Sequence, residues 1–290
     1  MNKDTKFSTF TICCGKKILS FDRPVVMGIL NSTSDSFYDG GRYTDAEAIE
    51  RRARQIFDEG ADIIDIGVVS TRPGALLLSP EEESTRLVSV VKRVRGLFPD
   101  VIISVDTCFS LPARKAIEAG ADIVNDISGG QFDEAMFPTV AELQVPYILM
   151  HTQGTPDHMQ DNPHYDDILQ EVAQYFSQRV SQLHLLGVRD IILDPGFGFG
   201  KTLDDNYRLF NRLPQLKQLF PHLPLLVALS RKSMMYRLLG TTPDEVLPST
   251  LALDMLAVDR GAQLIRVHDV KEAVQTMRVW SHLQNMNNNN

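Results

Sequence analysis

The sequence predicts a (β/α)8 TIM barrel, in which eight parallel strands close into a sheet that helices surround. Two observations predict it. Short apolar runs rich in Val and Ile recur eight times, as expected of strands buried on both faces. Stretches with helical spacing of apolar residues separate these runs, and this alternation in a chain of 290 residues is typical of the barrel. No linker divides the chain, so we expect a single domain over residues 1–285 and a disordered, low-complexity tail at 286–290.

The expected strands follow a short N-terminal hairpin. Residues 7–21 alternate in polarity and turn at Gly15, which predicts a β-hairpin that closes the floor of the barrel. The eight apolar runs then come in order, at residues 25–30, 62–67, 101–105, 121–124, 146–150, 190–193, 225–229 and 264–268.

Start signals for helices lie between these runs. Thr44 and Glu47 have the spacing of a capping box. Ser79 and Glu82 have it too, with Pro80 at the first helical position. Apolar residues with helical spacing share one face of a later, long helix, namely Ile168, Val172, Phe176, Val180 and Leu183.

Polar residues follow or end the expected strands. In such barrels the carboxyl ends of the strands carry the active site. A single Asp or Asn in this position is most often a turn former or a helix cap, whereas many polar residues on one rim indicate a polar pocket. The rim residues are Asn31, Arg72, Asp106, Asn125, Asp194, Lys232, Arg266 and His268.

The expected pocket has two kinds of lining. Asp106, Asp194 and Asn125 can accept hydrogen bonds from a ring edge rich in N–H groups, such as that of an aminopyrimidinone. A polyanion would suit the other residues, Arg72, Arg266, His268 and Asn31, because one guanidinium group can donate two parallel hydrogen bonds to its oxygens. A heterocycle joined to a phosphate-type leaving group fits both linings.

The glycine-rich segment at residues 193–202, LDPGFGFGKT, does not fit a nucleotide-binding loop. Pro195 stands where a P-loop needs a backbone N–H donor, and the glycines miss the dinucleotide spacing. Asp204 and Asp205 open the next helix and would repel a phosphate there. We therefore expect a tight turn, in which Lys201 is structural or solvated.

Composition limits the partners of the chain. Its net charge of −8 argues against a general affinity for nucleic acid. No apolar run approaches the roughly 18 residues of a membrane span, and the first ten residues lack the apolar stretch of a signal peptide. We therefore expect a cytoplasmic protein without a membrane or nucleic-acid partner.

Eight motifs, in register from about residue 24 to 280, resemble the dihydropteroate synthase family: MGILNSTSDSFYDGG, STRPGA, SVDT, AGADIVNDISGG, LMH, LDPGFGFGKT, LSRKS and RVHD. The resemblance implies a transferase of folate biosynthesis with a (β/α)8 barrel, usually homodimeric. It implies that para-aminobenzoate is joined to 6-hydroxymethyl-7,8-dihydropterin pyrophosphate, with Mg²⁺ assisting and pyrophosphate leaving. It also implies a target of sulfonamide drugs.

Carried over by motif, the resemblance implies three neighbouring subsites. The pterin pocket would use Asp106, Asn125, Asp194 and Lys232, with Met150 packed on the ring. Pyrophosphate would be held by Asn31, Arg72, Arg266 and His268, with Asn31 touching Mg²⁺. Aminobenzoate would lie near Phe37, Thr71, Pro73, Phe199 and Ser230. The catalytic set would be Arg266, His268, Lys232 and Asn31, which orient the substrates and stabilise the leaving group without a covalent nucleophile.

Four loop positions depart from the usual pattern of that family: Ser32, Ser34, Val68 and Val69. The departures spare the polar residues of the pocket. Two alternative functions stay open. The first is a catalytically silent relative that binds pterin, because the substituted loops are those that close over substrate, and the second is a pterin-dependent methyltransferase domain. The basic residues of SRKS and RVHD argue against the methyltransferase, because methyl transfer has no pyrophosphate for them to hold.

Overall fold

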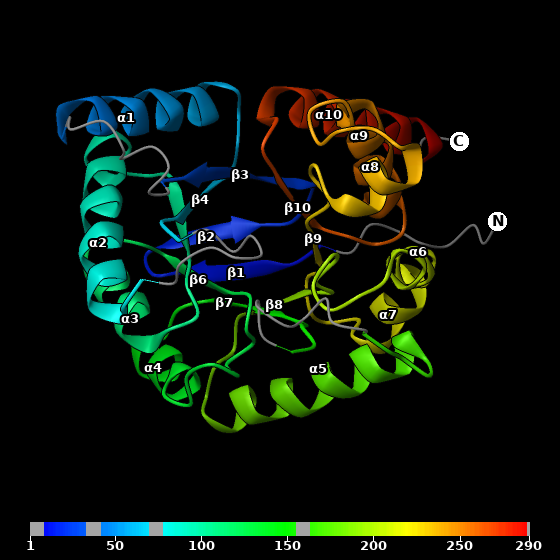
Figure 1. Cartoon of the computed structure of the whole chain (residues 1–290), viewed down its shortest axis with the longest axis horizontal. Coiled ribbons are helices and arrows are strands. Elements are labelled where there is room, and N and C mark those ends of the chain that lie inside the picture. Colours follow the sequence, from blue (N-terminus) through cyan, green and yellow to red (C-terminus); the bar gives the residue numbers. More distant parts are fainter. Residues whose placement is uncertain (1–8, 33–41, 70–77, 155–162, 289–290) are drawn as a thin grey trace.

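The computed structural model describes residues 9–32, 42–69, 78–154 and 163–288. Across these ranges eight parallel strands form one sheet in the order β8-β7-β6-β5-β4-β3-β10-β9, with helices around it (Figure 1). A bridge between Leu193 and Leu225, beside β9, brings the two ends of the sheet together. The predicted (β/α)8 barrel is confirmed.

Each predicted apolar run overlaps one strand, and each strand pairs in parallel with its neighbours. The strands are β3 (Val25–Asn31), β4 (Ile63–Gly67), β5 (Ile102–Asp106), β6 (Ile123–Asp126), β7 (Tyr147–Met150), β8 (Ile191–Asp194), β9 (Leu226–Val227) and β10 (Leu264–Val267).

The helices lie on the outside of the sheet. They are α1 (Arg42–Asp58), α2 (Pro80–Leu97), α3 (Ser110–Glu118), α4 (Met136–Leu143), α5 (Ile168–Leu185), α6 (Leu203–Asn211), α7 (Leu213–Leu219), α8 (Ser233–Leu239), α9 (Leu247–Asp259) and α10 (Val270–Asn288). The simple alternation is therefore broken twice, because two helices follow β8 and two follow β9. No helix in the described part of the chain is long and apolar enough to cross a membrane.

The capping signals were correct in one case and wrong in the other. Ser79 caps α2 in a reciprocal box with Glu82, with Pro80 in the first turn, as predicted. In contrast, α1 already begins at Arg42, so Thr44 lies inside the helix and not at its cap. The same three-residue spacing occurs within any helix, which makes this local pattern ambiguous. The expected apolar face of α5 is buried at all five positions.

The interior of the barrel has an apolar floor. Inward-facing residues at the amino ends of the strands form one cluster with the hairpin of β1 (Thr11–Cys14) and β2 (Lys17–Ser20), which turns at Gly15 with φ 63°. The prediction that the hairpin closes the floor is confirmed. The cluster contains Ile12, Cys14, Leu19, Phe21, Val25, Met27, Ile63, Ile102, Ile123, Ile148, Ile192, Leu226 and Leu264.

The same inward face becomes polar toward the carboxyl ends of the strands. Alternate residues of a strand share one face, so the residue two places after each floor residue also points inward. On five strands this position is polar, namely Asp65, Ser104, Asn125, Asp194 and Arg266, whereas β3, β7 and β9 have Ile29, Met150 and Ala228 there. An apolar floor beneath a polar mouth is the arrangement that positions the candidate site.

Candidate active site at the barrel mouth

Sheet register brings several of the predicted residues to one level. Asn31 pairs with Gly67, Gly67 with Asp106, and Asp106 with Asn125 across four adjacent strands. A Cβ atom at Gly67 would lie 3.4 Å from Asn31 Oδ1 and 3.6 Å from Asp106 Cβ. The glycine therefore leaves the Asn31 and Asp106 side chains as neighbours at the mouth.

Arg266 of β10 connects the predicted ring-binding and anion-binding groups. Its Nε donates to Asp65 Oδ2 at 2.6 Å and its Nη2 donates to Asp106 Oδ2 at 2.8 Å. Asp65 is fully buried, so this guanidinium compensates carboxylates that have little access to water. The structure joins the two groups of residues that the sequence had suggested as separate linings.

Asp65 is a residue that the sequence reasoning missed. Its second contact is with Asn125, whose Nδ2 donates to Asp65 Oδ2 at 3.2 Å. Because the amide nitrogen of Asn125 donates to Asp65, its Oδ1 is left as an acceptor for a ligand. Among the described residues, the other oxygen of Asp65 and the buried hydroxyl of Ser104 have no hydrogen-bond partner. The missed signal was a lone Asp in the middle of the apolar run DIIDIG.

Burial perturbs the charges at the mouth. It raises the pKa of Asp106 to about 7, against the opposing effect of Arg266. It also raises the pKa of Asp194, where the Gly196 N–H and Lys232 act in the opposite direction. Burial lowers the pKa of Lys232 to about 8, with Asp194 opposing. Buried carboxylates and cations with shifted pKa values close together are typical of a functional site.

Asp194 ends β8, and the loop that follows the strand holds its side chain. Asp194 Oδ1 accepts the backbone N–H of Gly196 at 2.8 Å. Gly196 has φ 68°, and a Cβ there would collide with the His151 carbonyl oxygen, so only glycine fits. Lys232 Nζ lies 4.2 Å from the centre of the Phe199 ring, within the range of a cation–π contact. Lys232 and Phe199, which the sequence predicted for the site, therefore face each other.

Lys201 holds this loop from behind. Its buried Nζ donates to the carbonyl oxygens of Gly196 at 2.8 Å and Phe199 at 3.0 Å, and lies 3.0 Å from His151 Nδ1. Burial lowers the pKa of Lys201 to about 7 and that of His151 well below its ordinary value. These contacts agree with the expectation that Lys201 is structural and not a phosphate ligand.

His268 and Ser230 form a second pair on the rim. Ser230 Oγ lies 2.9 Å from His268 Nδ1 and accepts the His268 backbone N–H at 3.2 Å. Burial, assisted by Arg266 and Arg231, lowers the pKa of His268 to about 4, so the ring is neutral at pH 7. With the serine proton donated to Nδ1, the ring hydrogen is on Nε2, which can donate to an anion.

Some predicted residues fall outside the described ranges. They are Ser34, Phe37, Thr71, Arg72 and Pro73.

Met150 is described; it is buried at the end of β7 and pairs in register with Asp194. Ser32 is buried and donates its N–H to the Gly67 carbonyl at 2.8 Å, and Val68 belongs to the core between strands and helices.

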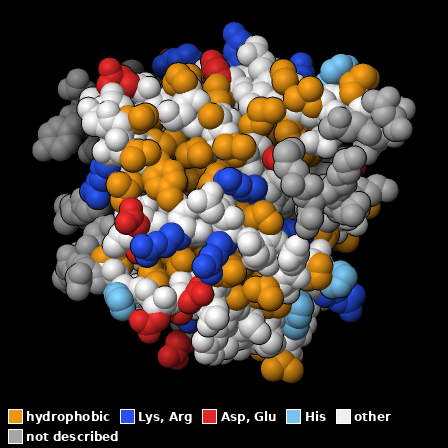
Figure 2. All heavy atoms as spheres, turned by 90° about the vertical axis from the view of Figure 1, so that its right-hand side faces the viewer, with side chains coloured by type: hydrophobic (Ala, Val, Ile, Leu, Met, Phe, Trp, Pro, Cys, Tyr) orange, Lys and Arg blue, Asp and Glu red, His pale blue; other side chains and the backbone are white. Residues whose placement is uncertain are grey.

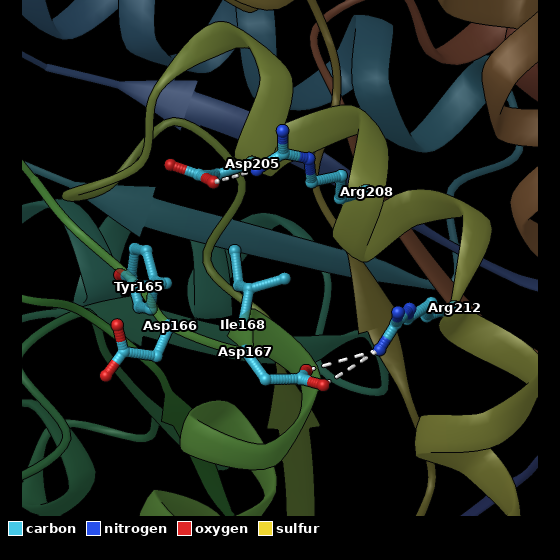
Figure 3. A pocket seen from close by; sticks show the side chains of 7 residues that line it. All are labelled: Tyr165, Asp166, Asp167, Ile168, Asp205, Arg208 and Arg212. Atoms are coloured by element: carbon cyan, nitrogen blue, oxygen red, sulfur yellow. Dashed lines mark hydrogen bonds and ion pairs between the residues drawn. The ribbon is translucent and has the colours of Figure 1, made fainter.

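A separate cleft of about 240 Å³ lies between the start of α5 and the segment from α6 to Arg212 (Figure 3). Both arginines of its lining already have acidic partners there, because Arg212 pairs with Asp167 at 3.2 Å and Arg208 lies 3.6 Å from Asp205. None of its lining residues belongs to the predicted site, so it does not compete with the barrel mouth as the candidate active site.

Comparison with known proteins agrees with the geometry. The sequence pattern of a family described as pterin binding enzyme matches residues 27–268. Dihydropteroate synthase of Escherichia coli K12 is 44% identical over 263 residues, which cover 90% of this chain and 92% of that protein. The synthase of a Synechocystis species is 43% identical over 260 residues, 89% of either chain.

Solved structures extend the similarity to three dimensions. Yersinia pestis dihydropteroate synthase with a sulfonamide drug superposes with a TM-score of 0.88 at 39% identity, over 95% of this chain and all of that one. The Xanthomonas albilineans synthase with 4-aminobenzoic acid gives a TM-score of 0.87 at 39% identity, over 96% and 99% of the two chains.

Proposed function

This chain belongs to the dihydropteroate synthase family of pterin-binding enzymes, and we propose that its barrel mouth joins 6-hydroxymethyl-7,8-dihydropterin pyrophosphate to para-aminobenzoate. The observation that carries the proposal is the shared guanidinium of Arg266. Its contacts support a mouth in which a cation for the leaving group would lie beside Asp106 and Asn125, which suit the pterin edge.

The pterin ring has a set of acceptors prepared for its N–H groups. Asn125 presents Oδ1 because its Nδ2 is bound to Asp65, and Asp194 keeps one oxygen beyond the one that accepts Gly196. Acceptors facing donors give the specificity of a polar pocket, since a ligand without the donors would leave buried oxygens unpaired. Asp106 and Lys232 complete this subsite, with Met150 against the ring.

The leaving pyrophosphate meets Arg266, the Nε2–H of His268 and Asn31, with Arg72 assigned to the same group by its motif. Burial lowers the pKa of His268 to about 4, so the ring meets the phosphate as a neutral donor whose Nε2–H can make a directed hydrogen bond. Asn31 ends β3 with an exposed side chain whose amide oxygen is the kind of hard ligand that Mg²⁺ prefers. Mg²⁺ bound there would neutralise charge on the phosphate oxygens.

The reaction is a displacement at the C9 methylene of the pterin. The aromatic amine forms the new C–N bond, the C–O bond to pyrophosphate breaks, and the amine releases a proton. Lys232 and Asp194 hold the ring, Arg266 and His268 hold the departing oxygens, and Ser230 with Phe199 borders the position for aminobenzoate. Fixed donors and restricted geometry account for this kind of catalysis without a covalent nucleophile.

Sulfonamides are proposed inhibitors of this chain. A sulfonamide is bound in the similar Yersinia pestis synthase and 4-aminobenzoic acid in the Xanthomonas albilineans synthase. We expect a sulfonamide to raise the apparent KM for para-aminobenzoate without lowering the maximal rate.

The assembly is proposed to be a cytoplasmic homodimer. Figure 2 shows apolar side chains gathered on the side of the molecule that carries α8, α9 and α10. Exposed apolar residues on these helices include Leu238, Leu239, Leu256, Val279 and Leu283. A patch of this kind favours association of two copies, because burial of apolar area drives it. Light scattering of wild type and Leu283→Arg tests the surface, and a monomeric wild type would contradict it.

Pyrophosphate release is the decisive test of the activity. Purified protein with Mg²⁺ and both substrates is expected to release pyrophosphate and form dihydropteroate, whereas omission of para-aminobenzoate is expected to abolish product. A silent relative would bind pterin without release, and a pterin-dependent methyltransferase would neither need aminobenzoate nor release pyrophosphate.

A further inference from the structure

Arg231 has a backbone conformation that a side chain disfavours. The Lys232 N–H donates to the Leu229 carbonyl at 3.0 Å, which closes a β-turn with Arg231 at its third position. The φ of Arg231 is 58°, in the left-handed region that turns normally give to glycine or asparagine. The strained residue lies directly between Ser230 and Lys232, two residues of the proposed site.

An ion pair on the outer side of the turn holds Arg231 in place. Its Nη2 and Nε donate to Asp269 Oδ1 at 2.8 Å and Oδ2 at 3.2 Å, a two-pronged arrangement that fixes the guanidinium plane. The Arg231 N–H lies 3.4 Å from Thr250 Oγ1 of α9. A further contact from Nη1 to Asp244 lies at the surface, where the aspartate is 86% exposed.

Two consecutive residues of one loop are thus bound to two consecutive residues of another. Ser230 contacts His268 at the mouth, and Arg231 contacts Asp269 behind it. The loops follow β9 and β10, which are neighbours in the sheet. The Arg231–Asp269 ion pair can therefore set the positions of Ser230 and Lys232, which flank Arg231.

We propose that the Arg231–Asp269 ion pair is a positioning device, which maintains the left-handed turn and thereby places Ser230 and Lys232 toward the substrates. Neither Arg231 nor Asp269 touches a substrate in this proposal. It rests on the proposed synthase function for the kinetic consequences, but its structural consequence, a turn that loosens when the pair is broken, is independent of it.

Replacement of Arg231 by glycine and by alanine separates conformation from charge. Both variants lose the ion pair, but glycine adopts φ 58° freely whereas alanine does not. We expect Arg231→Ala to raise the KM values of both substrates by about tenfold, and Arg231→Gly by less than about threefold. Equal effects of the two variants would overturn the proposal.

A matched pair of aspartate variants tests the partner. Asp269→Asn is expected to act like Arg231→Ala, whereas Asp244→Asn, which removes only the surface contact, is expected to leave both KM values unchanged. In the Arg231→Gly background, Asp269→Asn is expected to have no further effect, because the turn no longer needs support. An additive loss would contradict the positioning role.

Hydrogen–deuterium exchange gives a readout that does not depend on turnover. We expect the Lys232 amide, which closes the turn, to exchange at least about threefold faster in Arg231→Ala and Asp269→Asn than in wild type and Arg231→Gly. Unchanged exchange in all variants would refute the proposal even in an active enzyme. An inactive wild type with the expected exchange pattern would refute the synthase function alone.

Discussion

The guanidinium of Arg266 is shared between two carboxylates, with Nε 2.6 Å from Asp65 Oδ2 and Nη2 2.8 Å from Asp106 Oδ2. These contacts cross 201 and 160 residues of sequence. Closure of the barrel makes them possible, because β10 is next to β3 and the arginine reaches past that strand to β4 and β5. The relationship couples the leaving-group side of the site to the pterin side.

Truncation of Arg266 is therefore expected to affect more than the pyrophosphate. Arg266→Ala leaves Asp65 and Asp106 without their counter-charge in a buried position, which is more costly than loss of an exposed pair. We expect weaker binding of free pterin as well as of pterin pyrophosphate, each by tenfold or more, in the range of about 1.5–3 kcal/mol. Isothermal titration with both ligands measures this. Unchanged affinity for free pterin would show that Arg266 serves the pyrophosphate alone.

Asp65 is expected to control the orientation of the Asn125 amide. In Asp65→Asn the replacement amide can donate as well as accept, so Asn125 is no longer held with its oxygen toward the ligand. We expect about a tenfold or greater loss of pterin affinity, from the disruption of one or two buried hydrogen bonds. The control is Ser104→Ala, which changes a buried neighbour paired in register with Asp65 but removes no observed hydrogen bond. Equal affinities in the two variants would contradict the role of Asp65.

The predictability of the structure differs between the sheet and the site. The strands were predictable because their burial on both faces requires continuous apolar runs. The N-terminal hairpin was predictable because only one of its faces is buried against the floor, so its apolar and polar residues alternate. Asp194 and Asn125 were found because they follow such runs. Asp65 was not found, because it lies inside an apolar run, and only its contacts in three dimensions show that it belongs to the site. The turn at Arg231 gave no local signal, since arginine does not favour positive φ.

Asp254 on α9 is expected to make stability fall as pH rises. It is fully buried, and neither carboxylate oxygen has a partner among the described residues. Burial, with a contribution from Asp269, raises its pKa from 3.8 to about 8. Between these values the unfolded chain releases the proton and the folded chain retains it, so unfolding becomes more favourable as pH increases. Below pH 4 both states are protonated, and above pH 8 the loss is complete.

Asp254→Asn removes this ionisation with little change in volume. We expect its Tm to exceed that of wild type by an amount that grows between pH 5 and pH 8, because the difference in stability increases by about 1.4 kcal/mol per pH unit, or roughly 4 kcal/mol over this range. Thermal denaturation of both proteins across that range measures the difference, and other titrating groups cancel in it. A difference that stayed constant with pH would show that Asp254 is ionised in the folded protein.

Asp194 is expected to be the main anchor of the pterin. Its Oδ1 is committed to the Gly196 N–H at 2.8 Å, which leaves Oδ2 to accept from the 2-amino and ring N–H groups of the ligand. In Asp194→Asn the amide oxygen can keep the Gly196 bond, so the new NH₂ group faces those donors. Loss of a charged hydrogen bond and an unpaired donor should cost roughly 2–4 kcal/mol, or about a thirty- to thousandfold weaker affinity. The loop itself should persist, because Lys201 still binds the Gly196 and Phe199 carbonyls. Calorimetric titration of a dihydropterin, with circular dichroism as the control for folding, tests this. A folded variant that binds within about threefold of wild type would rule out Asp194 as the anchor and assign the ring to Asp106 and Asn125.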